Sequence, residues 1–358
     1  MSDKLFQYLT RFYHIEEFPA LAAQAEKWKK SRPLAGKNIY DATPVFRNTM
    51  VKYYALQCAG AQVTAAVGKN IPCDENICKI LPEFGIKVAG NAEKTLTYDV
   101  VADCAGVSRQ IKSRNGYVEL TRSGLEYYAN FPRPVFSADS GVLKKLETIL
   151  GTGEGFLRAM KQLGYNDFKN KKVLVFGGGK VGRGVAHYAK RAGAEVAVVD
   201  LKKVALPNGI TYLDGNDEDS VRRAINESWC IVSVTGLAGA LKMWAADLIK
   251  SSAIIANMGV EDEFGRDVPV SRVLNEKRPL NFILDEPTHL KYIDATMALN
   301  NYGIEKLLFE TLPSGINFPP RELEKSIVTD IKNGGIIAAE MEFIISELDQ
   351  ISTFQSFI

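Results

Sequence analysis

Three glycines have the G-x-G-x-x-G spacing of a dinucleotide-binding turn. They are Gly177, Gly179 and Gly182 in the segment KVLVFGGGKVGRG. An apolar run precedes them and an amphipathic pattern follows, which predicts a strand, a turn and a helix. The first glycine allows the tight turn, the second lets the backbone approach a pyrophosphate, and the third allows close contact between helix and strand. Lys180 and Val181 begin the helix, whose N-terminus would face the phosphate.

Asp200 ends the next predicted strand, 23 residues after Gly177. A carboxylate at this place accepts hydrogen bonds from the ribose hydroxyls and repels a 2′-phosphate, so the pattern favours NAD over NADP. Lys202 and Lys203 follow and would favour a phosphate, but we interpret them as part of a solvated loop. The alternative is a Rossmann domain that binds no nucleotide.

Two further turns are expected beside this site. Thr235-Gly236 and Asn257-Met258-Gly259 close the fourth and fifth predicted strands of the same domain. Ligands of open α/β sheets bind outside the carboxyl ends of the strands, so these small residues would lie against the dinucleotide. Asn257 is expected to bond a carboxamide or a ribose. Each turn taken alone is equally compatible with an ordinary strand end.

Length and composition exclude several other classes of protein. The 358 residues indicate two domains, and 44 Lys and Arg against 42 Asp and Glu give no reason to expect nucleic-acid binding. His14, His187 and His289 lie far apart, so no metal site is expected. Five cysteines without a disulfide framework, a charged N-terminus and no apolar run of membrane-spanning length favour a cytoplasmic protein.

The elements that must position these residues form two α/β domains. Short apolar runs alternate with helical patterns, which predicts parallel sheets covered on both faces. We expect a Rossmann-type doubly wound NAD domain over residues 141–287 and an α/β substrate domain built from 1–140 and 288–358. The expected strands of the NAD domain lie at 171–179, 194–200, 210–214, 230–236, 253–259 and 281–287.

Outside that domain the patterns are less regular. Apolar runs at 37–42, 61–67, 86–89 and 98–105 predict strands, with helices at 45–59 and 74–83. The segment 107–135 is expected to be irregular, and 288–358 to contain helices only. Further helices are expected at 4–31, 141–164, 289–310 and 335–349.

An ordered series of segments resembles the S-adenosylhomocysteine hydrolase family over about residues 15–310. The series is more specific than any one of its motifs. It comprises EEFPALAAQAEKWKKSRPLAGKNI, CAGAQVTAAVGKNIPCDE, SADSGVLKKLETILGTGEGF, GGGKVGRG, SVTG, NMGVEDE and DEPTHLKYIDATMALNNYGIEKL.

The resemblance implies an outer substrate domain made by both chain ends, a central NAD domain, two hinges and a homo-oligomer. In that family a tightly held NAD oxidises the ribose 3′-hydroxyl, a thiol is eliminated, water adds, and the ketone is reduced again. The alignment places Thr121 and Ser123 in the family's threonine run beside the nicotinamide. It places Asp200 on the family's ribose-binding glutamate.

This chain departs from the family mainly at the substrate positions. Pro44, Val260 and Glu286 stand where the family has histidines, and Leu143 stands where it has a lysine. The family's C-terminal KPDHYRY segment has no counterpart. The cofactor positions are kept while the substrate positions are not, so the resemblance implies a changed substrate.

Four residues are candidates for the catalytic roles. Lys144 is one place from the family's lysine and would be the general base for a hydroxyl, and Glu147, at i+3, would share its helix face. Glu286 precedes Pro287 at the second hinge, and Asp103 remains from an aspartate pair. The alternatives are a solvated lysine, a charge at a helix N-terminus and a turn acid.

Three residues are candidates for substrate binding. Glu119 is expected on the same side of the first domain as Asp103. Arg47 and Arg122 replace neutral residues near the family's substrate pocket, and arginine suits bidentate binding of a carboxylate or a phosphate. If both arginines face the site, the substrate is an anion; a surface role for each is the alternative.

These observations predict an NAD-dependent enzyme that oxidises a secondary alcohol or amine of a small substrate. Whether the product is released or reduced again after elimination stays open at this point. A non-catalytic NAD-binding regulator and a true adenosylhomocysteinase are the two alternatives.

Overall fold

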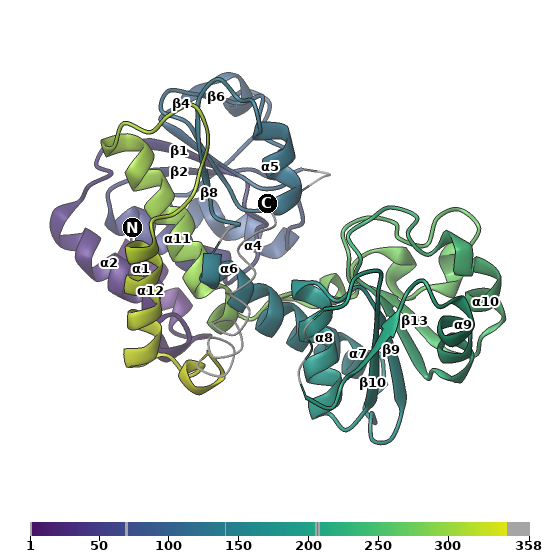
Figure 1. Ribbon diagram of the computed structural model, residues 1–358. Helices are drawn as coiled ribbons and strands as arrows, with labels where there is room; N and C mark the ends of the chain where they lie inside the picture. The colour runs from purple at the N-terminus through teal and green to yellow at the C-terminus, as the bar shows by residue number, and fades with distance from the viewer. Residues whose placement is uncertain (1, 69–70, 140, 205, 207, 342–358) are drawn as a thin grey trace. The chain divides into compact units, whose positions relative to one another are not determined.

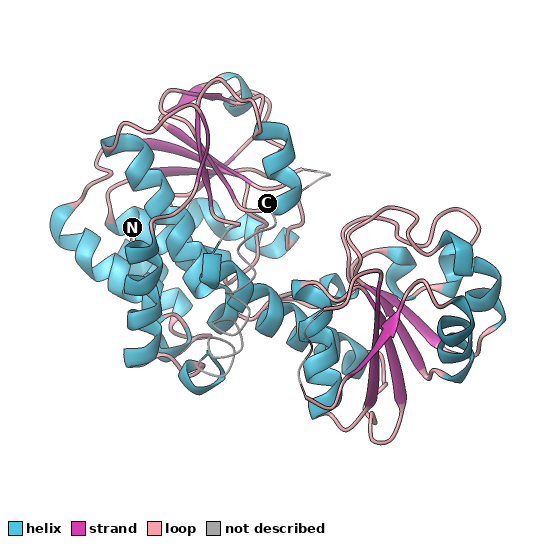
Figure 2. Cartoon of the chain, viewed as in Figure 1, coloured by secondary structure: helices cyan, strands magenta, loops and turns pink. Residues whose placement is uncertain are grey.

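In the computed structural model, which describes residues 2–68, 71–139, 141–204, 206 and 208–341, the chain forms two compact units (Figure 1). The first, here the terminal unit, comprises the described residues up to Lys145 and those from Leu290 to Met341. The second, the central unit, is Leu146–His289. Both contain parallel strands with helices packed against them (Figure 2). The predicted α/β class is confirmed.

The terminal unit is built on a seven-stranded parallel sheet with the order β14-β8-β7-β5-β1-β2-β3. A two-stranded parallel pair, β4 and β6, lies apart from it. The strands are β1 Asn38–Asp41, β2 Gln62–Ala65, β3 Lys87–Val88, β4 Thr97–Tyr98, β5 Val100–Asp103, β6 Lys112–Ser113, β7 Tyr117–Glu119, β8 Pro134–Ser137 and β14 Gly315–Asn317.

Two expectations for this unit are wrong. The segment 107–135, expected to be irregular, contains β7, a helix and the start of β8, and 288–358 contributes the edge strand β14. Both β7 and β14 are three residues long, which is too short for an alternating pattern to be recognised. Neighbouring strands in the sheet hold them in place.

The helices of the terminal unit come from both ends of the chain. The expected single helix over 4–31 is interrupted between residues 10 and 18, since a new helix begins with Pro19 at its first position. The expected helix over 335–349 lies largely outside the described residues. The helices are α1 Ser2–Leu9, α2 Pro19–Ser31, α3 Thr49–Cys58, α4 Glu75–Ile80, α5 Arg122–Tyr128, α6 Gly141–Leu146, α11 Leu290–Phe309 and α12 Arg321–Gly334, with 3₁₀ turns at Ile15–Glu17, Leu81–Phe84 and Glu93–Thr95.

Polar contacts between α2 and α11 join the two ends of the chain. The buried carboxylate of Asp294 accepts hydrogen bonds from the backbone N–H groups of Ala20 and Leu21, each at 2.9 Å. Further along the pair, the side-chain amide of Gln24 donates to the carbonyl of Ala298 at 3.0 Å. These contacts satisfy helix-end donors with a group 274 residues away, so the C-terminal part belongs to the same unit as the N-terminus.

The central unit has a five-stranded parallel sheet with the order β11-β10-β9-β12-β13. Buried side chains of α7 and α8 pack on one face, and those of α9 and α10 pack on the other (Figure 1). The strands are β9 Lys172–Phe176, β10 Glu195–Asp200, β11 Thr211–Asp214, β12 Cys230–Ser233 and β13 Ile254–Asn257; the helices are α7 Gly153–Gln162, α8 Lys180–Arg191, α9 Glu218–Glu227 and α10 Ala245–Lys250.

Two expectations for this unit also need correction. The run 281–287 is not a sixth strand: Leu280–Ile283 forms a 3₁₀ turn between two prolines, and the Asn281 side chain donates to the carbonyl of Pro287 at 3.3 Å. The helix expected over 141–164 is α6 and α7 joined by a π-helical segment, Glu147–Thr152. A Cβ on Gly184 of α8 would lie 2.1 Å from the carbonyl oxygen of Ile149, so this glycine lets α8 pack closely on the π-helix.

Candidate functional site

The glycine turn between β9 and α8 has the backbone geometry that its sequence predicts. Gly177 has φ +105°, in the region that favours glycine. A Cβ on Gly182 would lie 1.9 Å from the carbonyl oxygen of Gly177, so only glycine allows the first turn of α8 to pack against the strand end.

Gly179 differs from these two glycines because the space before it is open. It is the N-cap of α8 with an extended backbone (φ −70°), and no side chain caps the helix. Among the described residues, no heavy atom lies within 4 Å of an added Cβ at this position. A helix N-terminus without a side-chain cap that faces open space fits a pyrophosphate, because the first N–H groups of a helix have no acceptors within the helix and the helix dipole favours an anion.

Asp200, at the end of β10, is tied to the same turn. Its Oδ2 accepts a hydrogen bond from the backbone N–H of Gly178 at 2.8 Å, and its Oδ1 accepts one from Lys202 at 3.0 Å. A carboxylate has about four acceptor positions, so acceptor capacity is left for ribose hydroxyls. The residues of this turn therefore fit NAD.

The loop after β12 is held by a residue that the sequence patterns did not indicate, Glu263. Its buried carboxylate accepts hydrogen bonds from the backbone N–H groups of Thr235 and Gly236, both at 2.7 Å, and from the hydroxyls of Ser233 and Thr235. A Cβ on Gly259 would lie 2.0 Å from Glu263 Oε1. The turns Thr235-Gly236 and Asn257–Gly259 are thus fixed to one another. Only the predicted proximity of these turns could have pointed to Glu263.

Asn257 makes several hydrogen bonds within its own loop, and its expected contact with a carboxamide or a ribose stays a prediction. Its Nδ2 donates to the carbonyls of Glu261 at 2.8 Å and Lys277 at 2.6 Å, and its Oδ1 accepts from the N–H of Gly259 at 2.9 Å. Both amide hydrogens are used within the protein. Asn257 holds the backbone of this loop in place.

In the terminal unit, the predicted acids Asp103 and Glu119 lie at the carboxyl ends of neighbouring strands, β5 and β7, and are fully buried. Asp103 accepts hydrogen bonds from the N–H groups of Cys104 and Ser108, both at 2.8 Å, and from the hydroxyl of Tyr128 at 2.5 Å. Burial raises the pKa of the Asp103 carboxyl. Its contacts are those of a residue that fixes the loop after β5.

Glu119 makes a comparable set of contacts. It accepts hydrogen bonds from the N–H groups of Ala105 at 3.0 Å, Gly106 at 3.2 Å and Thr121 at 2.7 Å. Burial and the nearby carboxylate of Asp103 raise the pKa of Glu119 to about 7, against the lowering effect of these donors.

Thr121 and Ser123 belong to the same cluster. Thr121 is the N-cap of α5: its hydroxyl accepts from the N–H of Gly124 at 3.2 Å and donates to Glu119 at 2.7 Å. Ser123 is exposed. Their expected place beside a nicotinamide stays a prediction.

The other predicted site residues are distributed over both units. Lys144, in α6, and Glu147, the first residue of the π-helix, are both buried, so neither is a solvated helix side chain. The Oε2 atom of Glu286 lies 3.8 Å from Nδ1 of His289, and Nε2 of the same imidazole lies 3.7 Å from Oε1 of Glu154. Their catalytic roles stay predictions.

The two arginines are in unlike surroundings. The guanidinium of Arg47 lies 4.2 Å from the centre of the Phe12 ring, and its Nε is buried with no partner among the described residues. Arg122 is exposed in the first turn of α5. Substrate binding by either arginine stays a prediction.

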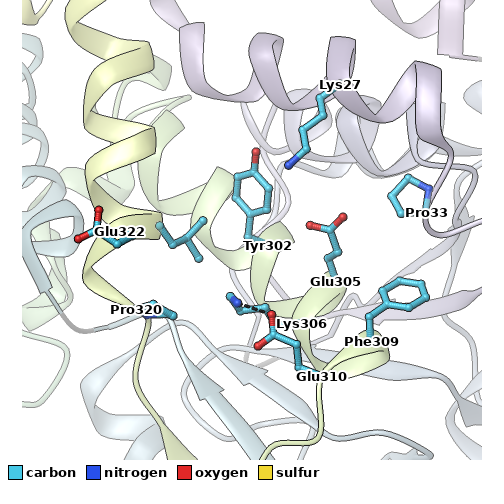
Figure 3. A pocket seen from close by; sticks show the side chains of 10 residues that line it. Lys27, Pro33, Tyr302, Glu305, Lys306, Phe309, Glu310, Pro320 and Glu322 are labelled. Atoms are coloured by element: carbon cyan, nitrogen blue, oxygen red, sulfur yellow. Dashed lines mark hydrogen bonds and ion pairs between the residues drawn. The ribbon is translucent and has the colours of Figure 1, made fainter.

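A surface cavity of about 670 Å³ lies elsewhere in the terminal unit, between α2, α11 and α12 (Figure 3). Its lining includes Lys27, Tyr302 and Glu305. It borders the C-terminal half of α11, where Leu307 packs near Gly116 and Pro134 at the amino ends of β7 and β8. Ligands bind at the opposite end of open α/β sheets, so this cavity is not the candidate site.

The described residues lack two further kinds of feature. Within those ranges, no group of three or more His, Cys, Asp or Glu side chains could hold a metal ion. The same part of the chain contains no helix of sufficient length and apolarity to cross a membrane.

Comparison with known proteins agrees with the geometry of the central unit. Residues 149–283 match the family model described as S-adenosyl-L-homocysteine hydrolase, NAD binding domain. Among solved structures, a dipicolinate synthase chain from Bacillus halodurans aligns with a TM-score of 0.50 and 15% identity, over 78% of this chain and 99% of that one. This likeness concerns the fold alone.

Two curated relatives extend the match beyond that domain. An adenosylhomocysteinase of Thermoplasma acidophilum is 24% identical over 295 residues, covering 74% of this chain and 70% of that protein. An S-inosyl-L-homocysteine hydrolase of Methanopyrus kandleri is 22% identical over 368 aligned residues, 87% of this chain and 86% of that protein.

These findings define the class first: the central unit is an NAD-binding domain, and NAD is the cofactor. The chain is a divergent relative of the S-adenosylhomocysteine hydrolases, which confirms the resemblance seen in its sequence.

Replacing Gly179 with alanine should separate cofactor binding from folding. The backbone at Gly179 suits an L-residue and the added methyl group meets no protein atom, so we expect the free energy of unfolding to stay within about 0.5 kcal/mol. The methyl group would occupy the space offered to the pyrophosphate, and the Kd for NAD should rise at least about tenfold, an effect of roughly 1.4 kcal/mol. Titration calorimetry and urea unfolding measure the two effects; an unchanged Kd would contradict this placement of the phosphate.

Replacing Glu119 with glutamine should change how stability depends on pH. The folded state keeps a proton on Glu119 up to about pH 7, whereas the unfolded chain loses it near the ordinary value of 4.5, so stability falls as pH rises through this window. The Glu119→Gln variant should lack this contribution, which is at most about 1.4 kcal/mol per pH unit. Urea unfolding at several pH values tests it, with Glu126→Gln, an exposed change on α5, as the control. Parallel pH profiles for Glu119→Gln and the native protein would refute the raised pKa.

Proposed function

We propose that this protein uses NAD to oxidise a secondary alcohol of a small substrate held at the carboxyl edge of the terminal unit's sheet. The observation that carries the proposal is the glycine turn, in which Gly177 and Gly182 are sterically required while the space before Gly179 stays open. Bound NAD supplies a two-electron acceptor for the alcohol carbon. The turn, Asp200 and the loop held by Glu263 would bind it.

The acid–base part of the chemistry requires a group that takes the proton of the hydroxyl. Asp103 and Glu119 already accept several hydrogen bonds from protein donors, which favours a positioning role for both. Lys144, which is buried, is the remaining candidate in the terminal unit. Glu147 and Glu286 are the candidates in the central unit.

A non-catalytic NAD-binding regulator is the second candidate function. The specific observation in its favour is that the carboxylates at the ends of β5 and β7 are committed to backbone donors. A homo-oligomer and a cytoplasmic location stay predictions.

The experiment is a substrate screen with NAD-loaded protein. S-adenosyl-L-homocysteine, S-inosyl-L-homocysteine and a panel of small secondary alcohols, neutral and anionic, are incubated while the absorbance of reduced nicotinamide and the release of thiol are followed. Accumulating NADH would indicate a dehydrogenase, and thiol without net NADH would indicate the internal redox cycle. Bound NAD with neither signal would contradict the proposal and favour the regulator.

The base assignment is tested on the active substrate. Lys144→Ala should lower kcat by about 10²-fold or more, the usual contribution of a general base. Lys145→Ala, the neighbouring change, should leave kcat within about threefold of the native value. Equal effects of the two changes would remove Lys144 from the mechanism.

A further inference from the structure

Two polar side chains on α11 are buried without a hydrogen-bond partner. Asn300 is 1% exposed, and neither its Nδ2 nor its Oδ1 contacts a donor or acceptor in the described part of the chain. Thr296 is fully buried, and its hydroxyl likewise has no partner there. Buried polar groups are nearly always hydrogen-bonded because leaving them unpaired costs free energy. Two such residues therefore require an explanation.

The next residue, Asn301, is satisfied in part: its Nδ2 has partners, whereas its Oδ1 is also buried with no partner in the described part of the chain. The Nδ2 of Asn301 donates to Gln24 Oε1 at 3.0 Å and to the carbonyl of Lys52 at 3.3 Å. Asn301 thereby joins α11 to α2 and α3. Asn300 faces another direction and forms no contact of this kind.

The direction in which Asn300 and Thr296 face follows from the packing of α11 on the sheet. A Cβ on Gly303 would lie 2.5 Å from the Phe136 ring in β8, and Leu307 packs near Pro134 at the start of the same strand. The helix therefore runs antiparallel to β8 (Figure 1). Residues spaced by three, four and seven share one helix face, so Thr296 and Asn300 continue the face of Gly303 and Leu307.

Helix and strand dimensions then give the level of each residue. Asn300 precedes Gly303 by about one turn, or roughly 4.5 Å along the helix axis, and Thr296 lies roughly 10 Å from Gly303. Phe136 is followed in β8 only by Ser137, one strand residue or about 3.3 Å further on. Asn300 is thus level with the end of β8, and Thr296 lies beyond it. This is the carboxyl edge of the sheet, where open α/β sheets bind ligands.

We propose that Asn300 and Thr296 bind a neutral group of the substrate that both donates and accepts hydrogen bonds, an amide or a pair of hydroxyls. An amide side chain offers two donors and one acceptor oxygen, and a hydroxyl offers both functions. A carboxylate or a fully ionised phosphate could not satisfy Asn300 Oδ1, because each only accepts. The buried cation on α3, Lys52, already pairs with Asp41 and donates to Thr43 at 2.9 Å.

This proposal deepens the proposed function, since it names the chemistry of part of the substrate, but its test does not require turnover. Acetamide and acetate have the same size and shape, yet only acetamide donates hydrogen bonds and is neutral. Ethylene glycol represents the hydroxyl pair. At about 0.5 M even a ligand of millimolar affinity stabilises the folded state measurably by mass action.

The experiment compares the Tm of the full chain with and without each probe. We expect acetamide, ethylene glycol or both to raise the Tm of the native protein relative to acetate, and the probe that does so indicates which group is bound. Asn300→Leu and Thr296→Val should reduce this increase. Thr329→Val, an exposed change on α12, should leave it unchanged.

Three outcomes would overturn the proposal: no difference between the neutral probes and acetate, the same protection in Asn300→Leu, or a lower Tm of Asn300→Leu without probe. The last outcome would show that the amide stabilises the fold itself. If the probes stabilise the protein as expected but the substrate screen gives neither NADH nor thiol, the proposed binding site is supported and the proposed oxidation is contradicted.

Discussion

Within each unit, buried acids accept hydrogen bonds from backbone N–H groups at the carboxyl ends of parallel strands. These contacts fix the loops that follow the strands. Asp103 and Glu119 fix the loops after β5 and β7, and Glu263 fixes the loop after β12. Asp200 fixes the glycine turn itself. Loops at this edge have N–H groups that no strand partner satisfies, and a buried carboxylate satisfies two or three of them at once.

The acids at these strand ends therefore fall into two kinds: those that only position a loop, and those that also keep hydrogen-bond acceptor positions for a ligand. Asp103, Glu119 and Glu263 accept several N–H and O–H donors of the protein and position loops. Asp200 belongs to the second kind, since it binds the glycine turn and keeps acceptor positions for the hydroxyls of a ribose. The cofactor end of the chemistry is therefore built into the fold of the central unit. The substrate end, as we propose it, depends on residues such as Lys144 and Asn300.

The sequence predicts the fold best where strands are long and their turns are sterically constrained. The segment from β9 to β10 combines strands of five and six residues with Gly177 and Gly182, where a side chain does not fit, and both features are visible in sequence. The three-residue strands β7 and β14 have no readable period. The run 281–287 is apolar like a strand, but Pro279 and the contact of Asn281 with Pro287 turn it into a 3₁₀ segment.

The residues of the candidate site also differ in how far the sequence could indicate them. Gly179 and Asp200 follow from a motif with a known mechanism, whereas the sequence did not indicate that both amide hydrogens of Asn257 bind carbonyls of its own loop. Glu263 and Asn300 could not be found from sequence, since an isolated acid or amide indicates nothing until packing buries it. Burial without a partner is visible only in the structure.

The most direct test of the central claim, that the central unit retains a complete NAD site, is titration calorimetry of the native chain with NAD and with NADP. The account predicts saturable binding of one NAD per chain and much weaker binding of NADP, because Asp200 accepts from ribose hydroxyls and repels a 2′-phosphate. Equal affinity for both dinucleotides, or no binding of NAD, would contradict it.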